Sequence, residues 1–256
     1  MSSNAVVSEL KLELTVHNFI GGRYSDPHKG VYYQCSTESA AKDSWLVPRS
    51  CAHDVERALE AANLVLPVWS EFSRERRVAM LANTADHLMV NRELLERSEL
   101  WDFATLSHTF AARAVASAIQ ALKSPRDLVL AVPQANRSLH PLSALPSAVT
   151  KQLFSGDSAL MPVARRIAPL LATGRPLVVG VLHKPNAPSS GRIMRLLGLV
   201  AEQLPPGVLN VLGGTATRMG SALIHSKQAE TTPLIPMCGC NDAGEPTTGK
   251  PRLVLH

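Results

Sequence analysis

The stretch Leu204–Gly220, LPPGVLNVLGGTATRMG, decides the fold class of this chain. Its Pro-Pro-Gly triplet ends a helix and begins a turn, and Val208–Leu212 is an apolar run of strand length. Gly213-Gly214 predicts a sharp turn, and Thr215 is a suitable N-cap for a following helix. Strand, glycine turn and helix N-terminus form a geometry that receives phosphate groups, because free N–H groups converge there. The local pattern fits equally a strand-to-helix turn that binds nothing, which is the commoner case.

Upstream of this stretch the chain alternates between helical and strand patterns. Asp157–Leu171 has helical periodicity and ends at Thr173-Gly174, a good C-terminal stop. Leu177–Leu182 is a continuous apolar run, as expected of a parallel strand buried on both faces. Gly191–Leu204 is again helical. Helix, strand, helix and strand in this order predict an α/β fold with βαβ units in an open parallel, Rossmann-like sheet.

The amino-terminal part predicts short strands followed by a helical layer. FIGGRY (Phe19–Tyr24) predicts a strand entering a tight turn, and Tyr32–Cys35 and Trp45–Val47 predict strands of a small antiparallel unit. A long helix is expected to start at His53-Asp54 and to end at Pro67.

Two further helical patterns and one irregular segment follow. Ser73 caps an expected helix over Arg74–Val90, and Arg92–Ala121 predicts one helix or two broken around Asp102–Thr105. The proline- and serine-containing segment after it contains one expected strand, Leu128–Val132.

Composition excludes several classes of protein. The 256 residues carry a net charge of +5, but the basic residues are dispersed, so nucleic-acid binding is not expected. No apolar run approaches the ~20 residues of a membrane span, and no secretory signal is visible. Four scattered cysteines do not form a disulfide scaffold, which favours a reducing, cytoplasmic compartment. Cys238-Gly-Cys240 has no second Cys/His pair at suitable spacing, so no metal site is expected.

Six segments in order resemble the aldehyde dehydrogenase superfamily over about Asn18–Gly239. They are FIGGRY, DVERALEAANLVLPVWSEFSRERRVAMLANTADHLM, ARRIAPLLATG, HKP, LPPGVLNVLGG and MGSALIHS. The resemblance implies a cofactor domain that binds NAD or NADP on a parallel sheet, and an arm used in subunit association. It divides the chain into an N-terminal extension (1–17), an incomplete NAD(P)-binding domain (18–240) and a divergent tail (241–256).

The resemblance also implies roles for individual residues. Lys184, in HKP, matches the family lysine that contacts the adenosine ribose, and Ala187 stands where the family has a glutamate for the ribose hydroxyls. Met237–Cys240 corresponds to the family's phenylalanine-threonine-glycine-serine turn. The positions expected near the pyrophosphate are Gly214, Gly220, Gly239 and Cys240.

Catalysis by this chain alone is not expected. In the family a cysteine thiolate attacks the aldehyde, hydride passes to the nicotinamide, an asparagine stabilises the oxyanion and a glutamate activates water. The asparagine position falls on Asp157, whose carboxylate would repel an oxyanion. The family cysteine and glutamate come well after the 237–240 turn, and only 241–256 follow here.

Three interpretations therefore remain open. The chain is the amino-terminal part of an aldehyde dehydrogenase, a pseudoenzyme or scaffold that acts by association, or a residual dinucleotide-binding module. Association with a second copy or with a related subunit, or else poor solubility, is expected, because a sheet interrupted after a few strands exposes an apolar edge and face.

Overall fold

The structure is a computed structural model that describes residues 13–36, 44–102, 107–123, 148–183, 190–226 and 230–231. The expected strand at 128–132 and the tail at 241–256 lie outside these residues. No described helix combines the length and apolar character that a membrane crossing requires.

A six-stranded sheet forms the centre of the molecule, with strand order β3-β2-β8-β7-β6-β9. Strands β6 to β9 pair in parallel, whereas β2 is antiparallel to both β3 and β8. The strands are β2 (Asn18–Ile20), β3 (Arg23–Ser25), β6 (Thr150–Ser155), β7 (Leu177–Leu182), β8 (Leu209–Gly214) and β9 (Glu230–Thr231). The parallel strands confirm the α/β fold class that the alternating patterns predicted.

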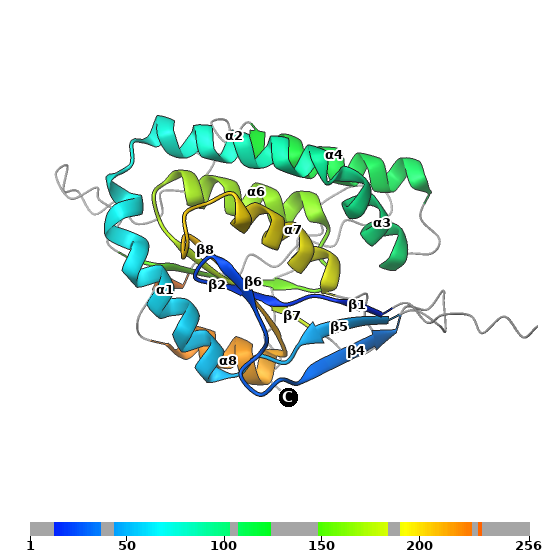
Figure 1. Cartoon of the computed structure of the whole chain (residues 1–256), viewed down its shortest axis with the longest axis horizontal. Helices are drawn as coiled ribbons and strands as arrows, with labels where there is room; N and C mark the ends of the chain where they lie inside the picture. The colour runs from blue at the N-terminus through cyan, green and yellow to red at the C-terminus, as the bar shows by residue number, and fades with distance from the viewer. Residues whose placement is uncertain are drawn as a thin grey trace, which may run out of the picture.

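Helices cover both faces of this sheet (Figure 1). On one face lie α6 (Leu160–Ala172) and α7 (Gly191–Glu202), covered in turn by α2 (Arg74–Val90), α3 (Arg92–Asp102) and α4 (His108–Lys123). On the other face lie α1 (Ala52–Glu71), the π-helical turn η1 (Ala216–Gly220) and α8 (Ser221–His225). The fold is therefore layered helix, helix, sheet and helix.

Alternating side chains of the strands divide the core into two clusters. Val178 and Leu212 point toward α1 and pack with Val55 and Leu59. Their strand neighbours point the other way, into a larger cluster that includes Val179, Val211, Ile167, Ile193, Leu196 and Leu197. Successive residues of a strand face opposite sides, so a continuous apolar run is what a strand buried on both faces requires.

A separate three-stranded sheet, here called the arm sheet, has strand order β1-β5-β4. It consists of β1 (Glu13–Thr15), β5 (Ser44–Pro48) and β4 (Tyr32–Ser36). The antiparallel pairing of β4 with β5, which places Cys35 opposite Trp45, confirms the small unit expected from the sequence. Trp45 is fully buried and fixes the arm sheet on α7, where a Cβ at Gly191 would lie 2.4 Å from its ring.

The expected end of the first helix at Pro67 is wrong. Helix α1 continues to Glu71 with Pro67 inside it, because Trp69 beyond the proline is completely buried. The Arg77 guanidinium then donates to carbonyl oxygens at the helix end, those of Trp69 and Ser70 at 3.4 Å each and that of Phe72. Burial and capping together offset the hydrogen bond that the proline removes.

The other helix boundaries mostly follow the sequence. Helix α2 spans the expected residues, and the Ser73 hydroxyl accepts from Arg76 N–H at 3.2 Å. The helical pattern over 92–121 corresponds to two helices, α3 and α4, and not to one continuous helix. Helix α1 begins at Ala52, and the carboxylate of Asp54 accepts from the N–H of its N-cap, Cys51, at 2.9 Å.

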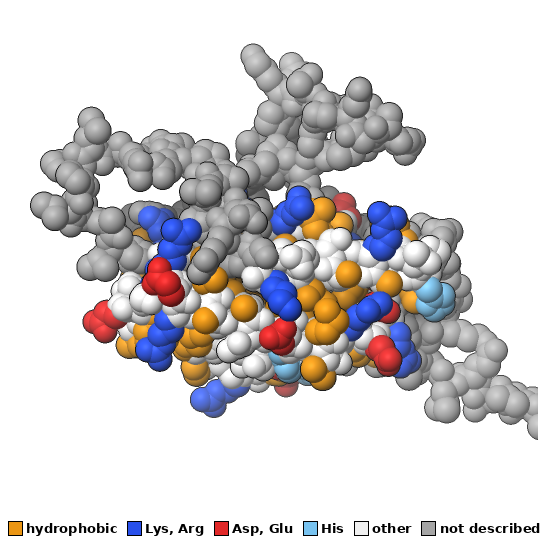
Figure 2. All heavy atoms as spheres, turned by 90° about the horizontal axis from the view of Figure 1, so that it is seen from above, with side chains coloured by type: hydrophobic (Ala, Val, Ile, Leu, Met, Phe, Trp, Pro, Cys, Tyr) orange, Lys and Arg blue, Asp and Glu red, His pale blue; other side chains and the backbone are white. Residues whose placement is uncertain are grey.

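Charges of both signs are mixed on the face formed by the outer helices. Figure 2 views the molecule from the side of α2 and α4, and basic, acidic and hydrophobic side chains are interspersed there. The electrostatic field of this face is therefore mixed in sign.

Candidate functional site

The carboxyl ends of the parallel strands β6, β7 and β8 meet at one edge of the large sheet. There Gly156 N–H donates to Leu182 O at 2.8 Å, and His183 N–H donates to Gly214 O at 2.7 Å. The chain runs β6, β7, β8 in one direction across the sheet and then returns to place β9 on the far side of β6. In open α/β sheets, ligands bind outside the carboxyl ends of the strands where the order reverses. That switch point lies between β6 and β9.

Strand β6, which borders the switch point, was not predicted from the sequence. Its residues Lys151 and Gln152 are polar yet buried, so the segment shows neither strict alternation nor a continuous apolar run. The Lys151 ammonium donates to the carbonyl oxygens of Ile224 at 3.3 Å and Ser226 at 2.7 Å, at the end of α8. Gln152 accepts from Arg166 at 3.2 Å. Gln152 Nε2 also donates to the neighbouring Leu153 O at 3.0 Å, but the partners of Lys151 and of Gln152 Oε1 are tertiary, and local sequence does not reveal them.

Asp157 lies in the turn that follows β6. Helix α6 begins at Leu160, so the expected helix over Asp157–Leu171 starts three residues too early and Asp157 is not helical. The Asp157 side chain is exposed at the carboxyl edge, which brings a carboxylate to the switch point. Its neighbour Gly156 allows close packing, because a Cβ there would lie 2.9 Å from Leu182 O and 3.1 Å from Ser190 Cβ.

The glycine pair at the end of β8 has a different role from the expected turn. Gly213 and Gly214 are extended residues of the strand, and neither has a positive φ. Close packing involves both: a Cβ on Gly214 would lie 2.7 Å from Met219 Cβ, and one on Gly213 would lie 2.6 Å from Met194 Sδ, near the flexible end of that side chain. The chain turns at Thr215 into η1, where Gly220 N–H donates to Thr215 O at 3.1 Å.

The glycines expected near a pyrophosphate are thus partly accounted for by packing. Gly214 and Gly220 are both buried, and η1 and α8 have five residues each. Their proposed proximity to a phosphate stays a prediction. Lys184, Ala187, Gly239 and Cys240 lie outside the described residues, so their roles also stay predictions.

Two polar clusters hold strand β8 and the arm sheet in register. Asn18 Oδ1 accepts at 3.0 Å both from the Ser50 hydroxyl and from Gly213 N–H, which ties β2 and the start of α1 to β8. Ser50 N–H in turn donates to Gly213 O at 3.0 Å. These bonds fix the last residues of β8 at the carboxyl edge.

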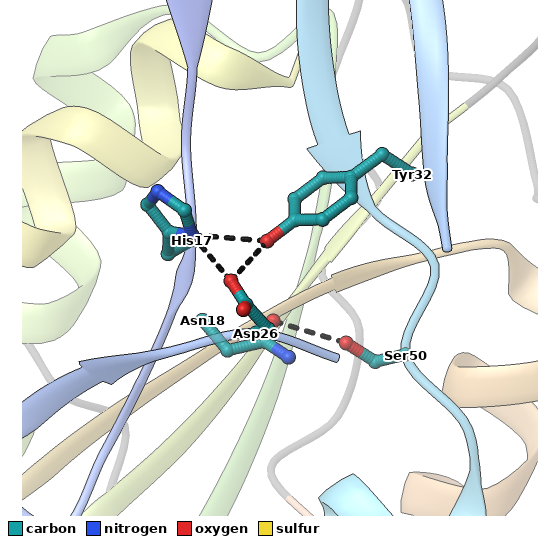
Figure 3. A network of polar contacts seen from close by, with 5 residues as sticks. All are labelled: His17, Asn18, Asp26, Tyr32 and Ser50. Atoms are coloured by element: carbon teal, nitrogen blue, oxygen red, sulfur yellow. Dashed lines mark hydrogen bonds and ion pairs between the residues drawn. The ribbon is translucent and has the colours of Figure 1, made fainter. Parts of the chain in front are cut away.

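The second cluster lies where the chain passes between the two sheets (Figure 3). The Tyr32 hydroxyl donates to Asp26 Oδ1 at 2.6 Å, and His17 Nδ1 lies 3.0 Å from the same oxygen and 2.9 Å from the hydroxyl. The hydrogen bonds from Tyr32 and then His17 hold the pKa of Asp26 below its usual value. This cluster joins β3 and β4 to the segment between β1 and β2.

His183 connects the carboxyl edge to the arm sheet. Its ring lies 5.2 Å from the Tyr33 ring at an interplanar angle of 32°, and the Cys35 Sγ lies 3.4 Å from its Nδ1. Burial lowers the pKa of His183, so the imidazole is neutral at pH 7. The described residues contain no group of three or more metal-ligating side chains.

The fold and the carboxyl edge of the large sheet define the class of protein. It is an α/β protein whose parallel strands have the order of a dinucleotide-binding half-domain. The aldehyde dehydrogenase family model matches residues 29–245. The chain therefore belongs to the aldehyde dehydrogenase family, as the resemblance of its motifs predicted.

Curated relatives match almost the whole chain. A probable aldehyde dehydrogenase of Mycobacterium tuberculosis is 27% identical over 254 residues, which cover 96% of this chain and 47% of the relative. Aldehyde dehydrogenase B of Escherichia coli is 32% identical over 229 residues, 86% of this chain and 43% of the relative. The chain thus spans just under half the length of these relatives.

Solved structures share the fold. An NAD-dependent aldehyde dehydrogenase from Sinorhizobium meliloti superposes with a TM-score of 0.70 at 18% identity, over 89% of this chain and 46% of that one. Betaine aldehyde dehydrogenase from Staphylococcus aureus, solved in complex with NAD+, superposes with a TM-score of 0.69 at 20% identity. The superposition covers 84% of this chain and 44% of that one. The likeness extends over nearly all of this chain and under half of each of those chains.

Proposed function

We propose that this chain is a dinucleotide-binding unit of the aldehyde dehydrogenase family, which binds NAD or NADP weakly and does not oxidise an aldehyde by itself. The strand order β8-β7-β6-β9 carries the proposal, because it creates a switch point at the carboxyl edge of the sheet. The similar enzyme from Staphylococcus aureus holds NAD+, which supports the same class of ligand here.

Two positions support weakened binding and absent catalysis. Ala187 offers no acceptor where the resemblance places a glutamate for the ribose hydroxyls. Asp157 places an exposed carboxylate after β6, where the resemblance places the oxyanion-stabilising asparagine. A carboxylate accepts hydrogen bonds and repels developing negative charge, so it opposes the chemical step.

A second candidate function is a scaffold that acts through association with a second copy or a related subunit. The arm sheet favours it: β1 and β4 are the outer strands, each paired on one side only within the described residues. Such edges expose backbone N–H and C=O groups that another strand can pair. Light scattering on the purified chain tests this candidate, and a sharp monomer would count against it.

Calorimetric titration with NAD and with NADP tests the main proposal. The native chain, Ala187→Glu, Ala187→Gln as the uncharged control, and an Asp157→Asn, Ala187→Glu double variant are compared. A restored carboxylate that accepts from the ribose hydroxyls contributes about 1.5–3 kcal/mol per charged hydrogen bond, so Ala187→Glu is expected to tighten NAD binding by roughly tenfold or more.

The outcomes separate the candidate functions. Measurable binding by the native chain, tightened in Ala187→Glu more than in Ala187→Gln, supports a working dinucleotide module. Binding only by the glutamate variants favours the scaffold, with a decayed site on an intact fold. No binding by any variant, all with native circular dichroism, would overturn the dinucleotide proposal.

A further inference from the structure

A thiol and an imidazole face one another where the arm sheet meets the carboxyl edge of the large sheet. Cys35 is on β4, and His183 directly follows β7, 148 residues later. The Cys35 Sγ lies 3.4 Å from His183 Nδ1 and 3.6 Å from Nε2. Within the described residues no comparable pairing is recorded for the other described cysteine, Cys51, which is the N-cap of α1.

The surroundings of this pair keep the imidazole in the neutral form that can accept a proton from sulfur. Burial keeps the pKa of His183 below its usual value, so the ring is neutral and free to accept a proton at neutral pH. Tyr33 stacks against the imidazole, and the Arg49 guanidinium lies 5.3 Å from the centre of the Tyr33 ring. The thiolate, not the thiol, is the nucleophile in thiol chemistry.

Cys35 is 5% exposed, so a reagent reaches its Sγ only after a local movement around the thiol that leaves Sγ beside His183. The topology permits such a movement, because β4 is an outer strand whose single partner among the described strands is β5. Local opening of an outer strand costs less than global unfolding.

We propose that Cys35 is a modification site, at which His183 acts as the base for reaction with low-molecular-weight disulfides. His183 accepts the proton from the Cys35 thiol, and the thiolate attacks one sulfur of the reagent. The reagent's S–S bond breaks as a Cys35 Sγ–S bond forms, and the second reagent sulfur leaves as a thiolate that takes up the proton. Cys35 is oxidised and the departing sulfur is reduced, so electrons and protons balance.

Modification at this position has a consequence for the neighbouring edge. The adduct lies against His183, and Lys184, which follows directly, matches the family's ribose-contacting lysine. A bulky group on Sγ would displace His183, the first residue of the HKP motif. We expect this displacement to weaken dinucleotide binding. This last step, unlike the modification itself, rests on the proposed function.

The test is the rate at which oxidised glutathione modifies Cys35 in the full chain at pH 7. Mass spectrometry of peptides follows Cys35 separately from Cys51, Cys238 and Cys240. His183→Gln is expected to slow the reaction of Cys35 roughly tenfold or more in the folded chain, because it removes the base. Tyr33→Phe is the matched control, since it keeps the ring and changes no base. In urea, where the contact is absent, all three chains are expected to react at one rate.

Equal folded-state rates in the native chain and His183→Gln, or a faster reaction in the variant, would overturn the role of His183. Failure of Cys35 to react in the folded chain, with normal reaction in urea, would overturn the site itself. A separate titration compares NAD binding before and after modification, with Cys35→Ser as the unmodifiable control. Absence of NAD binding by the unmodified chain would refute the proposed function and leave the labelling result standing.

Discussion

Replacing Glu99 with leucine is expected to destabilise the chain severely. Glu99 on α3 and Arg192 on α7 form an ion pair with Nη1 and Oε1 2.8 Å apart, and their side chains are 3% and 1% exposed. Removal of the carboxylate leaves the guanidinium charge in the interior without its ion-pair partner. Removal of one partner of such a pair typically costs about 3–5 kcal/mol, because the remaining charge cannot be rehydrated.

Urea unfolding followed by circular dichroism measures this cost. Glu99→Leu, Arg192→Met and the double variant are compared with the native chain. The single variants are expected to lose about 3–5 kcal/mol, and the double variant to regain most of the loss, since apolar replacements of both partners are often close to neutral. At about 2–4 °C per kcal/mol for a chain of this size, Glu99→Leu lowers Tm by roughly 6–20 °C.

The exposed pair between Arg92 and Glu96 on α3 supplies the control. Its side chains are 47% and 21% exposed, so Glu96→Leu is expected to change stability by only about 0.5 kcal/mol. A Glu99→Leu cost no larger than that of Glu96→Leu would refute the reasoning. It would mean that the buried carboxylate is not the counter-charge on which Arg192 depends.

Two other predictions concern backbone strain and a buried amine. Gly207 and Gly30 have φ of +88° and +63°, but a Cβ at Gly207 would lie 2.5 Å from Ala61 O whereas one at Gly30 meets nothing. Alanine at Gly30 is expected to cost about 1 kcal/mol and alanine at Gly207 clearly more, as measured by thermal unfolding; equal costs would contradict the packing argument. Burial lowers the pKa of Lys151, so the folded state disfavours its charged form and stability rises with pH from the lowered pKa toward the unfolded value of about 10.4. Unfolding free energies between pH 8 and about 9.5 are expected to rise more steeply in the native chain than in Lys151→Met, and parallel slopes would refute the assignment.

Local sequence patterns were sufficient to predict those elements whose structure depends on neighbouring residues in the sequence. The apolar run of β7 matches a strand buried on both faces, and Ser73 marks the start of α2. The order of the quoted motifs was enough to assign the family, because each motif keeps its place along the chain. These features depend on neighbours in sequence, so the sequence specifies them directly.

Other features depended on partners far away in the chain. Strand β6 has buried polar residues, and Lys151 is satisfied by carbonyl oxygens more than 70 residues later. Helix α1 continues through Pro67 because Trp69 is buried and Arg77 caps the end. Burial and hydrogen bonds that depend on the three-dimensional arrangement leave no mark in the hydrophobic periodicity, so β6 was missed and the end of α1 was placed too early.

The sequence by itself determined the α/β class, most helix boundaries and the family, because hydrophobic period, capping residues and motif order are properties of the linear chain. Only the tertiary structure decided that β9 lies beside β6, which creates the switch point at the carboxyl edge. It alone showed that Gly213 and Gly214 are extended residues held by Met194 and Met219, and that Cys35 faces His183. These are relations between residues that only the packing of the folded chain brings together.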